Sequence, residues 1–98
     1  MIQRTSKFLM ANLGAEMERF FYWKEKNDPQ MLAAAYDRAR KIIEQIAKCP
    51  DMATRAQEIK ILDDVINDLA SKTPKLNILP SYIHSYFAPF VNNAVKTI

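Results

Sequence analysis

Glycine and cysteine are almost absent from this sequence of 98 residues, which contains one of each, Gly14 and Cys49. Folds built from β-hairpins place glycine at turns and bulges, so a single glycine disfavours a turn-rich β fold. It also excludes a glycine-rich loop that would wrap a phosphate group. A lone cysteine cannot form an internal disulfide, and we expect the chain to act in the reducing cytoplasm.

Histidine is equally scarce, and the single His84 limits the chemistry that one chain can perform. A paired-histidine metal site needs two histidines, and a di-iron helical bundle needs a Glu-x-x-His motif from each of two helices. Cys49 is predicted to lie at the C-terminal end of a helix, where the helix dipole does not stabilise a thiolate. The sequence therefore predicts no catalytic residue, no metal and no cofactor, and we expect a protein that is not an enzyme.

Long apolar runs are also missing, because no segment approaches the roughly 20 apolar residues of a membrane-spanning helix. The first 15 residues contain Arg4 and Lys7, no acid and an apolar stretch from Phe8, which is a weak likeness to a targeting peptide. Because their helical periodicity continues past Glu16, we interpret this segment as the first helix of the fold.

The charge balance is mildly basic, with a formal net charge of +3 and an isoelectric point near 9.1. This excess is too small to indicate nucleic-acid binding on its own. A helix-turn-helix arrangement of the second and third helices would bring Arg55 to DNA, but Asp63, Asp64 and Asp68 would repel phosphate. Nucleic-acid binding is therefore a minor alternative.

What the sequence has in abundance is helix-forming residues with an apolar side chain every three or four positions. This pattern predicts helices over about 5–26, 29–48 and 54–72, and a fourth after the connection 73–77. Asp28 and Pro29 suit the start of the second helix, and residues 54–57 fit a capping box with Asp51 as a rival cap. Pro89 predicts a kink or a split in the last helix.

Short loops between helices of similar length favour antiparallel neighbours. We therefore predict an all-α fold, a single up-down-up-down four-helix bundle that occupies residues 1–98 as one domain. Each turn of each helix is expected to contribute about one apolar or aromatic residue to the core. The predicted core residues are Leu13, Phe20, Tyr36, Ile43, Ile59, Ile66, Ile83 and Phe87.

Two acidic residues interrupt the apolar stripes near the middle of their helices, Glu16 and Asp63, and Arg40 borders the stripe of the second helix. The first interpretation is a structural ion pair between Glu16 and Arg40, or side chains that extend out to water. The alternative is a buried carboxylate pair that binds a metal or a basic ligand. Carboxylates without histidine or cysteine partners make a poor metal site, which favours the structural interpretation.

Aromatic residues gather at one predicted end of the bundle, where the first helix ends and the fourth begins. The expected arrangement is a filled core layer in which Trp23, Tyr82 and Tyr86 pack against alanines of the second helix. The alternative is an apolar pocket there with tyrosine hydroxyls at its edge. Tyr22 falls on the polar side of its helix and is a candidate contact with a partner.

The function that these patterns favour is a small protein-interaction module or regulator that binds another protein, or itself as a homodimer, through a helical face. Ile61 supports it, because an apolar side chain is predicted on the polar side of the third helix. A small apolar-ligand binder that uses the aromatic end is the alternative. The candidate surface for either role comprises Tyr22, Trp23, Ile61, Tyr82 and Tyr86.

Overall fold

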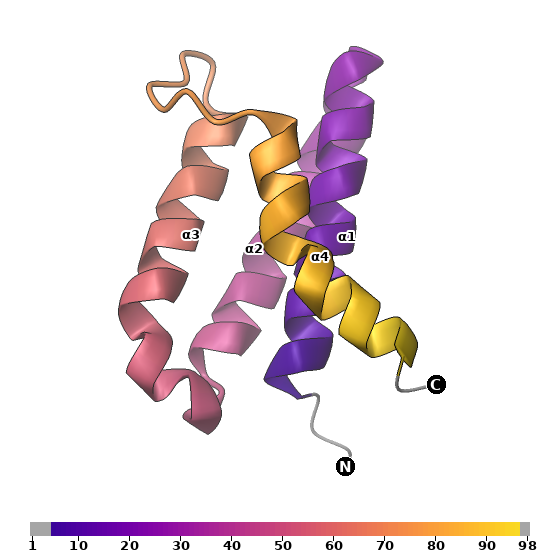
Figure 1. Cartoon of the computed structure of the whole chain (residues 1–98). Helices are drawn as coiled ribbons and strands as arrows, with labels where there is room; N and C mark the ends of the chain where they lie inside the picture. The colour runs from indigo at the N-terminus through magenta and orange to yellow at the C-terminus, as the bar shows by residue number, and fades with distance from the viewer. Residues whose placement is uncertain (1–4, 97–98) are drawn as a thin grey trace.

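The computed structural model describes residues 5–96, with side chains described for residues 5–90. It contains four α-helices and one short 3₁₀ helix: α1 (Ser6–Glu25), α2 (Pro29–Ala47), η1 (Pro50–Arg55), α3 (Ala56–Ala70) and α4 (Pro80–Lys96). Successive α-helices run in opposite directions along the molecule (Figure 1). The predicted all-α, up-down-up-down four-helix bundle is confirmed.

The first two helices begin where their sequences provide a side-chain cap. Thr5 Oγ1 accepts a hydrogen bond from the Phe8 amide at 3.1 Å, and Asp28 Oδ1 accepts one from the Met31 amide at 3.0 Å. Pro29 is the first residue of α2, where no backbone donor is needed. Asn27 joins the two helices in the left-handed region at φ 56°, which asparagine adopts more easily than most residues.

The start of α3 differs from the prediction. The capping box at 54–57 does not form, because Pro50 begins the six-residue 3₁₀ helix η1 and α3 starts at Ala56 without a side-chain cap. Met52 of η1 is buried and anchors this turn in the core. Asp51, the rival cap, instead accepts a hydrogen bond from the Ser6 hydroxyl at 2.5 Å and so ties η1 to α1.

The connection before α4 is longer than predicted, because residues 71–79 lie outside any helix. The carboxylate of Asp68 accepts hydrogen bonds from the backbone amides of Lys75 and Leu76 at 2.8 and 3.0 Å, which holds this loop against the end of α3. α4 continues through Pro89 and changes direction along its length (Figure 1). The proline therefore bends the helix and does not split it.

The core lies between the helices and contains all of the predicted core residues except Tyr36. Tyr36 is half-buried, and its hydroxyl donates a hydrogen bond to Oδ1 of Asn67 on α3 at 2.5 Å. Methionines and alanines also belong to the core, as do Leu9, Ile46, Leu62 and Leu69. These additional buried residues include Met10, Met17, Ala35, Ala39 and Met52.

The four helices are not packed equally. α1 packs along α2 and is crossed by α4, whereas α3 packs against α2, and the backbones of α3 and α4 hardly approach each other over the described residues. Gly14 lies at the crossing of α1 and α4, where an added Cβ would be 2.8 Å from Cβ of Phe87. The pair α1–α2 is thus the centre of the bundle, and the side between α3 and α4 is its most open side.

Candidate functional site

The buried acid predicted on α1 is part of an ion-pair cluster with two arginines. Glu16 is 6% exposed, and its carboxylate accepts hydrogen bonds from Arg19 at 2.5 Å and from Nε of Arg38 at 2.7 Å. The prediction that Glu16 is paired is confirmed, but the predicted partner, Arg40, is wrong. Arg38 and Arg40 are two residues apart on α2, so they project about 200° apart and only Arg38 faces α1.

Arg40 faces α3 and forms an ion pair with Asp63. Glu16 and Asp63 therefore bind different arginines on different sides of α2, and the structure does not bring them together as a carboxylate pair. Among the described residues, no group of three or more metal-ligating side chains lies close enough to hold a metal ion. Both acids have the structural role of joining α2 to a neighbouring helix.

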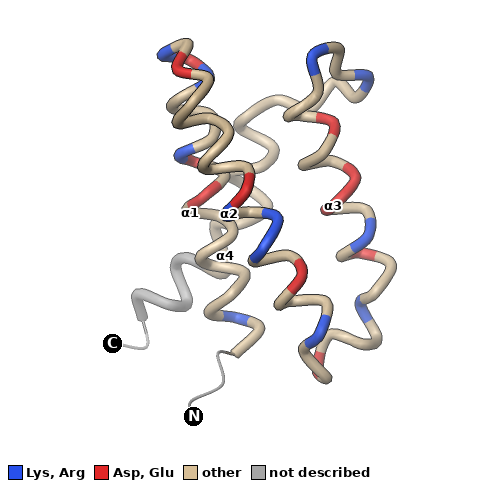
Figure 2. The backbone as a smooth tube through the Cα atoms, turned by 180° about the vertical axis from the view of Figure 1, so that it is seen from behind, with Lys and Arg blue, Asp and Glu red and all other residues tan. Residues whose placement is uncertain are grey.

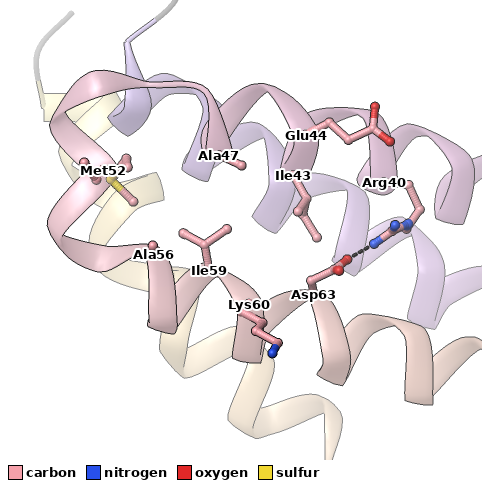
Figure 3. A pocket seen from close by; sticks show the side chains of 10 residues that line it. Arg40, Ile43, Glu44, Ala47, Met52, Ala56, Ile59, Lys60 and Asp63 are labelled. Atoms are coloured by element: carbon pink, nitrogen blue, oxygen red, sulfur yellow. Dashed lines mark ion pairs between the residues drawn. The ribbon is translucent and has the colours of Figure 1, made fainter.

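A cavity that sequence reasoning missed lies beside the Arg40–Asp63 pair, between α2, η1 and α3 (Figure 3). Its volume is about 320 Å³, and the nearly buried side chains of Ile43, Met52 and Ile59 line its apolar part. The ion pair stands at one end and Met52 at the other (Figure 3). Small alanines on α2, η1 and α3 leave this space unfilled, and nothing in the sequence marks them as neighbours.

The aromatic end is neither a filled layer nor the predicted pocket. Trp23 is half-buried, and its ring meets the ring of Tyr22 edge-on at 4.8 Å, with Tyr22 51% exposed. A shallow cavity of about 560 Å³ lies there, and it is lined by Phe21 and Tyr22 but not by Trp23, Tyr82 or Tyr86. The prediction that Tyr82 fills the core is wrong, because Tyr82 is 59% exposed.

Among the residues whose side chains are described, one hydrogen bond between α4 and α3 bridges the open side of the bundle. The Tyr86 hydroxyl donates to the carboxylate of Glu58 at 3.1 Å, and Arg55 donates to the same carboxylate at 2.5 Å. Burial, followed by the negative charge of Glu58 and the hydrogen bond to it, raises the pKa of Tyr86 from 10.0 to about 12, although the nearby Arg55 acts in the opposite direction. This hydrogen bond shows that Glu58 of α3 and Tyr86 of α4 lie at the same height along the bundle.

Two exposed apolar side chains lie one helical turn from that bridge. Ile61 is three residues after Glu58 and is 54% exposed, and Tyr82 is four residues before Tyr86. Because α3 and α4 run in opposite directions, both steps lead toward the same end of the bundle, about 5 Å along the helices (Figure 1). Helix spacing thus places Ile61 and Tyr82 at one level of the side on which Tyr86 meets Glu58, whereas Tyr22 and Trp23 belong to the aromatic end.

We call this surface the α3–α4 face and define it by Ile61, Val65, Leu79, Tyr82 and Tyr86. Val65 and Leu79 are one further turn from the bridge; Val65 is half-buried and Leu79 is 49% exposed. Each residue alone is unremarkable on a protein surface. Their alignment across two helices required the tertiary structure, since α3 and α4 are separated by a long loop.

The electrostatic character of this face comes from α3. Residues 56–70 carry four acids and one lysine, a formal charge of −3 in a chain whose net charge is +3. The acidic residues are distributed along α3 in Figure 2. Residues 80–96 of α4 contain no aspartate or glutamate, so of these two helices α3 alone carries acidic side chains.

No protein-family model, curated protein or solved structure matches the chain, so comparison with known proteins does not assign it to a family. In the part that the structure describes, no helix is long and apolar enough to cross a bilayer. The site has to be interpreted from its own residues.

Proposed function

We propose that this chain is a small, non-enzymatic interaction module of the cytoplasm that binds another protein through the α3–α4 face. The observation that supports the proposal is the alignment of Ile61 and Tyr82, each more than half exposed, on the side of the bundle where two helices hardly touch. Burying an isoleucine side chain fully contributes roughly 1.5–3 kcal/mol, and the ring of a tyrosine adds further apolar area. A partner that covers this face would gain part of that free energy from each residue.

The test is affinity capture with the tagged chain in the cells that express it. Ile61→Ser and Tyr82→Ser are expected to lose the captured protein, because both remove apolar area from the face without disturbing the core. Met31→Ser is the matched control, since Met31 is also exposed and apolar but lies on the first turn of α2. Capture that is the same for all three variants would refute the α3–α4 face as the binding surface.

Self-association through the same face is the other form of this proposal. Sedimentation equilibrium of the purified chain distinguishes a homodimer from a monomer. If the partner is a second copy, the mass in solution is that of a dimer and falls to a monomer in Ile61→Ser but not in Met31→Ser. If the unmodified chain, Ile61→Ser and Met31→Ser are all monomers, the proposed partner is a different protein.

A small apolar ligand is the second candidate, and the cavity between α2, η1 and α3 favours it more than the aromatic end does. Charged side chains border both cavities, but three buried apolar side chains, Ile43, Met52 and Ile59, line the first, whereas Leu69 alone does so among the described residues at the shallow cavity. Native mass spectrometry of the chain purified from its own cells reports a bound small molecule directly. Ala56→Leu, which fills the cavity, is then expected to release it while leaving protein capture unchanged.

A further inference from the structure

We infer that the occupant of the α3–α4 face is an amphipathic helix whose apolar stripe is flanked by lysine or arginine. The inference rests on the proposed function and adds the chemistry of the partner. It follows from what surrounds Ile61: an acidic helix on one side and, on the other, a helix whose residues 80–96 contain no acid.

The acids of α3 differ in what already binds them. Asp63 is paired with Arg40 on the side of α3 that faces α2. Glu58 is bonded to Arg55 and Tyr86, and both oxygens of Asp68 are bonded to loop amides. These three carboxylates hold the fold together.

Asp64 is different, because it is exposed and makes no ion pair or hydrogen bond with any other described residue. It lies three residues after Ile61, which on a helix places the two side chains on neighbouring positions of one face. A partner side chain that covers Ile61 therefore brings its own neighbours to Asp64. A cation there gains a charge-assisted contact, and an anion meets repulsion.

The occupant is a helix because the face itself is a straight, two-sided strip. Ile61 and Val65 on α3 are spaced one turn apart, as are Tyr82 and Tyr86 on α4. Apolar residues of a helix at positions i, i+3, i+4 and i+7 repeat with the same rise of about 5.4 Å per turn. Basic residues beside that stripe on one flank would then lie next to Asp64.

The experiment uses two synthetic helical peptides of about 18 residues, or five turns, with the same leucine stripe. One carries lysine beside the stripe and the other carries glutamate. Fluorescence anisotropy measures the affinity of each for the full chain at low and high salt. We expect the lysine peptide to bind about five- to tenfold more tightly, and the difference to shrink at high salt because exposed charges are screened.

Variants of the chain locate the effect. Asp64→Lys is expected to remove or invert the preference, and Asp37→Lys, an exposed acid on α2, to leave it unchanged. Ile61→Ser is expected to weaken both peptides. Circular dichroism melting confirms that each variant is folded, which we expect because all three positions are exposed.

The outcomes separate the inference from the function on which it rests. Equal affinity for the two peptides, lost in Ile61→Ser, overturns the basic flank and retains the α3–α4 face as a binding surface. Failure of both peptides to bind also overturns the inference, while the capture experiment still tests the function. Binding that ignores Ile61→Ser overturns both.

Discussion

Gly14 shows how much a single residue can decide in this fold, because it sets how closely α4 crosses α1. The atom that an added Cβ would meet is Cβ of Phe87 at 2.8 Å, which moves only if the backbone of α4 moves. Gly14→Ala is therefore expected to destabilise the protein by about 1–2 kcal/mol, since overpacking exceeds the gain of roughly 1 kcal/mol in helix propensity. Urea denaturation measures the difference.

A control for this prediction is the reverse substitution one position along the helix. Ala15→Gly, at a half-buried site, is expected to lower the free energy of unfolding by roughly 1 kcal/mol, because glycine has a lower helix propensity than alanine. If Gly14→Ala instead stabilises the chain by that amount, α4 does not lie against Gly14 as described.

At the scale of helices, the choice between Arg38 and Arg40 fixes which sides of α2 face α1 and α3. A double-mutant cycle tests it directly. Glu16→Gln combined with Arg38→Gln is expected to show a coupling energy of about 0.5–1 kcal/mol, since the two side chains are bonded at 2.7 Å and only Glu16 is buried.

Glu16→Gln combined with Arg40→Gln is the matched control and is expected to be additive, because Arg40 is paired with Asp63. Coupling to Arg40 and additivity with Arg38 would contradict the described rotation of α2. The free energies of unfolding come from urea titrations of the six proteins.

At the scale of the whole molecule, the hydrogen bond from Tyr86 to Glu58 links α4 to α3. The burial of Tyr86, together with this contact, makes the stability of the fold decrease at alkaline pH. The pKa of Tyr86 is raised to about 12 from an ordinary value of 10.0, so the unfolded chain loses this proton first. The contribution to stability is complete below pH 10 and is lost as the pH rises toward 12.

Tyr86→Phe isolates this effect from other groups that titrate at alkaline pH. The variant is expected to lose less stability than the wild type between about pH 10 and pH 12, because its side chain has no proton to lose. Absorbance at alkaline pH should also show one tyrosine fewer in the last phase of the titration. Parallel losses of stability in the two proteins would contradict the shift at Tyr86.

The sequence determined the helices, their order and most of the core, because these depend on residues near one another in the chain. Asp28 and Pro29 start α2 through contacts within one turn. The periodic apolar residues then select the buried face of each helix, so Leu13, Ile43 and Ile66 could be placed in the core without a structure.

The tertiary structure alone decided how those faces meet. The rotation of α2 about its axis turns Arg38 toward Glu16, so that these two side chains pair. The close approach of α4 to α1 leaves no room for a side chain at Gly14. The α3–α4 face depends on Ile61 and Tyr82 standing at one level across a long loop. These features arise from contacts between residues far apart in the chain, and periodicity along one helix carries no information about the level or rotation of its neighbour.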